Sequence, residues 1–171
     1  MPDNLKASIE RELDRLELLL DQISAVEAER EGQLTKAEAP VGKMLLDFKG
    51  IGPEFASVLW TEGLFRHFDN RRQVASYAGL APTPWQSGSV SHEQGVSKAG
   101  NARLRTAMIE LAWLWLRNQP TSSLSLWFKQ RVGDGRRKKP VIVAMARKLL
   151  VALWKYVASG VVIEGAVMKH A

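Results

Sequence analysis

The first forty residues place apolar side chains along one narrow face of a helix. Charged residues fill most other positions, and the apolar ones recur every three or four residues, at Leu5, Ile9, Leu13, Leu16, Leu20 and Ile23. This spacing is typical of a coiled-coil seam. Glu27 and Arg30 take the next seam positions, so the seam covers only about three heptads. We therefore predict a long helix over residues 1–38 that forms a homo-oligomer through residues 5–23.

The alternative for this helix is an amphipathic segment that packs against its own domain. In either case, Gly32 and the run "KAEAP" predict that the helix ends near residues 36–40.

The composition limits the classes of protein that fit the chain. With 171 residues, 46% of them hydrophobic and 25% charged, the chain can bury a core. It has no cysteine, which excludes disulfides, thiolate metal sites and cysteine nucleophiles. No apolar run approaches the roughly 20 residues of a membrane span, and the N-terminus lacks the apolar core of a signal peptide. We expect a soluble, cytoplasmic protein with no membrane partner.

Charge is distributed unevenly along the chain. Residues 1–40 hold five Lys/Arg against ten Asp/Glu, residues 41–96 hold five of each, and residues 97–171 hold fourteen against three. A strongly cationic C-terminal half indicates a protein that neutralises phosphates. The alternative is a basic surface that only contacts solvent.

The segment "LLDFKGIGPEFASVLWTEG" fits a helix-hairpin-helix over residues 45–59. Its pattern positions are Leu45, Phe48, Gly50, Gly52, Ala56 and Leu59. The glycines permit a tight turn with positive φ, Pro53 suits the start of the second helix, and Ala56 lets the helices approach closely. Backbone N–H groups at the start of the second helix can then hold a DNA phosphate. The alternative is a helical connection without a ligand.

The rest of the chain is predicted to be mainly helical. A helix begins at Asp69 or Asn70 and ends near Gly79, and the segment after it is a loop, or a short hairpin that turns at Ser87 and Gly88. Further helices begin at Lys98, near residues 121–123, and after the basic loop "GRRKKP". We predict an all-α fold with a domain at 41–158 and a tail at 159–171, for which no structure is assigned.

Few residues offer catalytic or metal-binding chemistry. The histidines His67, His92 and His170 are scattered, which argues against a metal site, and no nucleotide-binding Gly-rich loop is present. His92 could act as a base for Ser97, but a lone loop histidine is usually only solvated. Ser97 has two interpretations: it is the N-cap of the following helix, or it is a nucleophile held among cations beside a phosphodiester.

Four successive motifs resemble a known family. They are "FKGIGPEFASVLWTEG", "FDNRRQVASYAGLAPTPWQSG", "GVSKAGNARLRTAMIELAW" and "KKPVIVAMARKLLVALWKYV". Together they resemble the C-terminal transposase domain of bacterial insertion-sequence transposases that carry a RuvC-like DEDD nuclease domain at their N-terminus. Some members of that family are bridge-RNA-guided recombinases. The resemblance covers about residues 41–158.

The resemblance implies specific roles for this chain. The serine of a "SKxGNxxLR" motif, here Ser97, would be the nucleophile that links covalently to DNA, and a helix before the domain would mediate oligomerisation. DNA would be the partner, with a guide RNA as a second one. With the hairpin and the charge pattern, it leads us to expect nucleic-acid contacts at Lys49, Gly50, Gly52, Lys98, Asn101, Arg103, Arg105, Arg136, Arg137, Lys138 and Lys139.

Two differences from the family qualify these expectations. The segment "SHEQGVS" lacks the basic residues that many relatives carry before the serine. The DEDD domain is missing, so we expect its divalent metal to bind outside this chain, no cofactor within it, and a fragment of a transposase that is inactive alone. The alternatives are a non-catalytic helix-hairpin-helix DNA-binding module, and a coiled-coil assembly domain whose basic surface holds RNA or protein.

Overall fold

A computed structural model describes residues 3–35, 40–87, 90–133, 135 and 137–169, without the side chains of residues 3, 34–35, 83–87 and 90–94. Its elements are, in order, α1 (Asp3–Thr35), α2 (Pro40–Leu46), α3 (Pro53–Leu59), the π-helix η1 (Trp60–Leu64), α4 (Arg71–Tyr77), β1 (Pro82–Ser87), β2 (Val90–Val96), α5 (Ala102–Asn118), α6 (Ser123–Gly133) and α7 (Lys138–Ser159). The predicted all-α class is confirmed, with one β-hairpin added.

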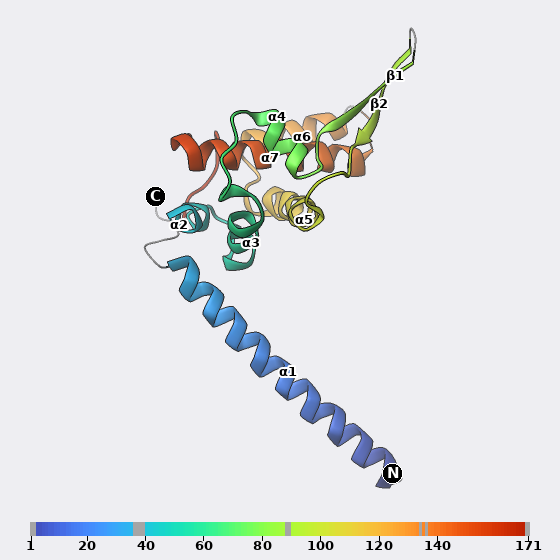
Figure 1. The fold of residues 1–171 in the computed structure, drawn as a ribbon, viewed down its shortest axis with the longest axis vertical. Helices are drawn as coiled ribbons and strands as arrows, with labels where there is room; N and C mark the ends of the chain where they lie inside the picture. Colours follow the sequence, from blue (N-terminus) through green and yellow to red (C-terminus); the bar gives the residue numbers. More distant parts are fainter. Residues whose placement is uncertain (1–2, 36–39, 88–89, 134, 136, 170–171) are drawn as a thin grey trace.

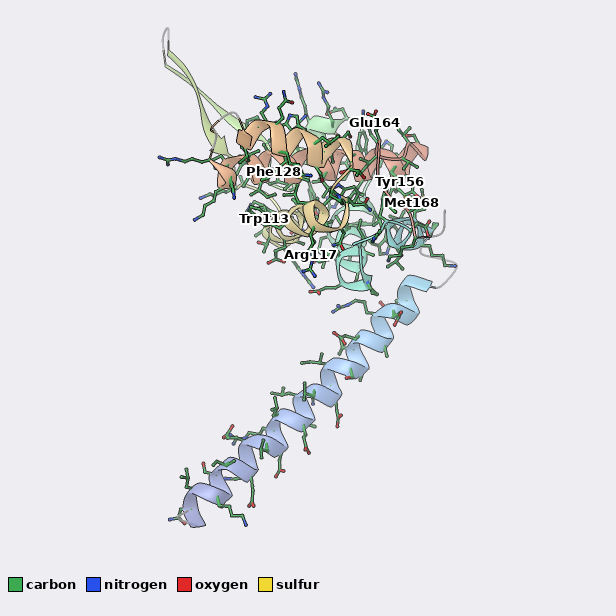
Figure 2. All side chains as sticks on the ribbon, turned by 180° about the vertical axis from the view of Figure 1, so that it is seen from behind. Trp113, Arg117, Phe128, Tyr156, Glu164 and Met168 are labelled. Carbon is green, nitrogen blue, oxygen red and sulfur yellow. The ribbon has the colours of Figure 1, made fainter. Side chains whose placement is uncertain are left out.

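Helix α1 projects from the rest of the molecule as a straight rod (Figure 1). Only its C-terminal part, near the half-buried Arg30, approaches α2 and α3. The six predicted seam residues are between 43% and 53% exposed, and Figure 2 shows the side chains of this helix standing clear of the body. The alternative of a helix packed along its own domain is therefore wrong. Self-association of the seam stays a prediction.

The core of the body lies between α5, α6 and α7, with α2 and α3 packed beside them. Phe48, from the turn after α2, packs against Trp115 and Tyr156 with ring centroids 5.5 and 4.8 Å apart. Trp115 is buried and donates its indole N–H to the Ser122 hydroxyl at 2.9 Å. Among the described helices, none combines the length and apolar character that crossing a bilayer requires.

Helices α2 and α3 lie where the hairpin pattern places them. Gly50 has φ 95°, and a Cβ there would lie 2.6 Å from the Cβ of Asn118, so this position requires glycine. Gly52 has φ −97° and open space around it, so the expected positive φ is wrong at this position. Pro53 begins α3, as predicted, and Ala56 is fully buried. The identification of this pair as a DNA-binding helix-hairpin-helix stays a prediction.

The tail after α7 crosses the turn between α2 and α3. Lys49 N–H donates to the Val167 carbonyl at 3.1 Å, and the Lys169 ammonium donates to the Ile51 carbonyl at 2.8 Å. The fully buried Gln119 joins the two segments, because its amide nitrogen donates to the carbonyls of Lys49 and Val167, both at 2.8 Å. The C-terminal tail is thus part of the fold.

The segment that leads to Ser97 consists of α4 and a hairpin. Asn70 caps α4 by accepting hydrogen bonds from two backbone N–H groups, and Gly79 follows it with φ 65°, as predicted. Strands β1 and β2 pair antiparallel, so the hairpin alternative is correct. The predicted turn at Ser87 is wrong, because Ser87 is the last residue of β1 and pairs with Val90. Gly88, in the predicted turn, lies outside the described residues. The hairpin extends away from the helices (Figure 1).

Candidate nucleic-acid interface

Ser97 lies in a short loop between β2 and α5 and is exposed. Its backbone N–H donates to the Ala81 carbonyl at 2.9 Å, and its hydroxyl donates to the Ala99 carbonyl at 3.3 Å. Lys98 has φ 53° and Gly100 has φ 146°. Neither angle fits an α-helix, so the prediction that a helix begins at Lys98 is wrong.

The N-cap of α5 is Asn101. Its side-chain oxygen accepts a hydrogen bond from the Leu104 N–H at 2.9 Å, and α5 begins at Ala102. Ser97 lies four residues too early to bond the free N–H groups of this helix. The interpretation of Ser97 as the cap is therefore wrong.

The loop around Ser97 is held from several sides. Asn101 N–H donates to the Tyr77 carbonyl at 2.8 Å, and the Arg105 guanidinium donates to the Lys98 carbonyl at 2.8 Å. A Cβ at Gly100 would lie 2.5 Å from the Tyr77 oxygen, so the loop lies directly on the end of α4. These contacts keep the exposed Ser97 on a fixed piece of backbone.

Glu62 supplies a further support for the same loop. It lies in η1, and π-helical turns often occur at functional sites. One of its carboxylate oxygens accepts from the Asn101 amide at 2.8 Å, and the other accepts from the Arg103 guanidinium at 3.1 Å. Asn101, Arg103 and Arg105 therefore all have partners within the chain. Their predicted contact with nucleic acid stays a prediction.

A basic groove of about 900 Å³ begins beside this loop. Its cations come from two elements that are distant in sequence: Arg71 and Arg72 in α4, and Arg147, Lys148 and Lys155 in α7. No acidic residue lines the groove among the described residues, and no described carboxylate forms an ion pair with any of these five side chains. We call this feature the basic groove.

Sequence reasoning missed the basic groove. The available signal was in α7, where Lys155 follows Arg147 and Lys148 by two helical turns, so that the three cations lie on the same side of a mainly apolar helix. Another signal was the pair Arg71 and Arg72 in the first turn of α4, which has no acidic residue there. Cations at a helix N-terminus oppose the helix dipole and lower the stability of the helix. Their presence there therefore indicates a role other than stability, such as binding an anion.

The remaining predicted contacts lie outside the groove lining. Lys49 is exposed in the α2–α3 turn. Arg137 is the N-cap residue of α7, and Lys138 and Lys139 are exposed in its first turn. Arg136 lies outside the described residues, as does the side chain of His92. The structure therefore divides the described predicted contacts between the Ser97 loop, the first turn of α5, the α2–α3 turn and the start of α7.

Acidic and imidazole side chains do not gather in the part of the chain that the structure describes. It contains no group of three or more His, Asp or Glu that could hold a metal ion.

Comparison with known proteins gives close relatives. A Sinorhizobium fredii protein named "Putative transposase y4rJ" is 69% identical over 99% of this chain and 46% of its own length. An uncharacterized 43.6 kDa protein of insertion element IS110 from Streptomyces coelicolor is 29% identical over 73% of this chain and 31% of its own length. The transposase for insertion sequence element IS1328 from Yersinia enterocolitica is 28% identical over 84% of this chain and 43% of its own length.

The chain thus spans less than half the length of each of these relatives. The family model described as Transposase IS116/IS110/IS902 matches residues 42–125, which include the α2–α3 turn, α4, the hairpin, the Ser97 loop and α5. Residues 42–125 are therefore a Transposase IS116/IS110/IS902 family domain.

Proposed function

We propose that this chain binds DNA and supplies Ser97 as the nucleophile for strand cleavage and transfer in DNA transposition. The observation that carries the proposal is the exposed Ser97 hydroxyl on a loop that contacts α4, η1 and α5. A nucleophile needs such a fixed position, because catalysis depends on holding the reacting atoms in a near-attack geometry.

The chemistry would be nucleophilic substitution at phosphorus. The Ser97 oxygen forms a bond to the phosphorus and gives up its proton to a base, while a P–O bond of the DNA strand breaks and the leaving oxygen takes up a proton. Charge grows on the phosphoryl oxygens during this step. The adjacent Lys98 and the basic groove would stabilise that charge and favour the serine alkoxide.

The proposal includes partners outside the chain. A RuvC-like domain with its divalent metal would complete the enzyme, so the chain alone would be inactive in strand transfer. A guide RNA and a second copy of the chain, joined through the exposed seam of α1, are further proposed partners.

A non-catalytic DNA-binding module is the second candidate. It is favoured by the internal partners of Asn101, Arg103 and Arg105, since these contacts give the motif a purely structural use. In that case Ser97 would be an exposed loop serine without a chemical role.

Recombination by a protein that joins this chain to a RuvC-like domain separates the two candidates. Ser97→Ala should abolish strand transfer and the covalent protein–DNA adduct seen on denaturing gels, because a methyl group cannot attack phosphorus. Ser97→Cys tests whether a thiol can replace the hydroxyl. Ser159→Ala is the matched control, since Ser159 is an exposed serine that lies outside both the Ser97 loop and the groove lining. Normal recombination by Ser97→Ala would refute the catalytic role and leave the DNA-binding module.

A further inference from the structure

We propose that the basic groove binds an unpaired DNA strand and leads it to Ser97. This inference rests on the proposed DNA binding and adds a site and a kind of substrate to it. It concerns five cations that are not among the individual contacts predicted from the sequence.

Charge is the first argument. Five cationic side chains from α4 and α7 line one groove with no acidic residue among its described lining. None of them forms an ion pair with a described carboxylate. Lys148 instead places its ammonium over the Trp127 ring, 4.9 Å from the ring centroid, so its charge is not neutralised by an acid either. Holding so many like charges together opposes folding, and a polyanion in the groove removes that repulsion.

The floor of the groove is the second argument, and it favours a single strand. Ala75, Leu124, Val151 and Ala152 line the same space as the cations. A duplex presents phosphates on its convex outer surface and keeps its bases stacked inside, so it offers little to a concave apolar floor. An unpaired strand can place sugars and base faces on that floor while its phosphates meet the cations.

Continuity with the Ser97 loop is the third argument. Ser76, Ala81 and Pro82 also line the groove. The Ala81 carbonyl accepts the hydrogen bond from Ser97 N–H at 2.9 Å. A strand bound in the groove would therefore lie next to the loop that carries Ser97.

A pair of charge reversals tests the site. Arg72→Glu with Lys155→Glu changes two exposed groove cations whose side chains make no hydrogen bond or ion pair with the described residues. The matched control is Arg117→Glu with Lys43→Glu, which changes the net charge equally at an exposed arginine and an exposed lysine outside the groove. A milder pair, Arg72→Gln with Lys155→Gln, should give an intermediate loss. Thermal unfolding of each variant checks that it is folded.

Fluorescence anisotropy of the 171-residue chain gives the readout. The probes are labelled oligothymidylate of about twelve nucleotides, oligouridylate of the same length, and a DNA duplex of the same length. We expect the oligothymidylate to bind about tenfold more tightly than the duplex, with a log–log salt slope of about −3.5 for five cations. The groove variant should bind it at least about tenfold more weakly with a slope no steeper than about −2, and the control should stay within about twofold.

Several results would overturn the inference and leave the proposed DNA binding intact. These are duplex binding as tight as strand binding, or equal weakening by the groove and control variants. Tighter binding of oligouridylate would assign the groove to RNA and refute the DNA strand. Failure of the chain to bind any DNA probe would overturn the inference and the proposed DNA binding together.

Discussion

Replacing Asn101 by alanine should destabilise the protein far more than replacing Ser97. Asn101→Ala removes the α5 cap, which contributes about 1 kcal/mol. It also removes the hydrogen bond to the Glu62 carboxylate, whose side chain is 23% exposed. A hydrogen bond to a charged group contributes about 1.5–3 kcal/mol when buried, and partial exposure reduces this one to about 1 kcal/mol. The expected total is about 2 kcal/mol.

Ser97→Ala loses only an exposed hydroxyl bond of 3.3 Å, so we expect less than about 0.5 kcal/mol. Thermal unfolding followed by circular dichroism measures both variants. For a chain of 171 residues, about 2 kcal/mol lowers Tm by about 4–8 °C, whereas the Ser97 variant should stay within about 2 °C. A loss of stability in Ser97→Ala as large as the loss in Asn101→Ala would refute the assignment of Asn101 as the cap. It would restore the interpretation of Ser97 as the N-cap.

Three further predictions follow from the fold. Leu16→Asp with Leu20→Asp places charges in the exposed seam and should abolish self-association, and an unchanged mass by light scattering would reject the coiled coil. Gly52→Asp should fold and should weaken DNA binding for all sequences alike. Gly50→Ala should instead lower Tm, because of these two glycines Gly50 is the one with positive φ and a crowded Cβ position. Unchanged DNA affinity of Gly52→Asp would show that the hairpin does not contact DNA. Burial, and to a smaller extent the charge of Asp47, raises the pKa of Tyr156, so the folded state favours the neutral phenol. This contribution to stability is complete below about pH 10, the pKa of an unfolded tyrosine, and is lost as pH rises through the folded pKa. Urea unfolding should therefore show a smaller loss of stability at alkaline pH for Tyr156→Phe than for the unaltered chain.

The sequence was sufficient to predict a helix where residues at its two ends determine where it begins and stops. Asn70 before α4 and Gly79 after it predict that helix correctly, because a cap and a left-handed glycine act on neighbouring backbone groups. Pro53 at the start of α3 is a similar case. Such residues carry their structural role in any surrounding fold.

Long-range contacts decided the features that sequence reasoning missed. Ser97 and Asn101 are both good caps, and the choice between them depends on contacts with Tyr77 and Glu62, which the sequence does not place nearby. The basic groove likewise joins α4 to α7, elements separated by the hairpin and two helices. Periodicity within one helix cannot reveal which cations from a distant helix will line the same groove.

The tail that crosses the α2–α3 turn affects the order in which parts of the protein can fold during synthesis. The Lys169 ammonium bonds to the Ile51 carbonyl across a sequence separation of 118 residues. During synthesis, the turn is made first and must wait for nearly all of the domain before its last hydrogen bonds can form. A nascent chain would therefore carry an unfinished α2–α3 turn until the tail has been translated.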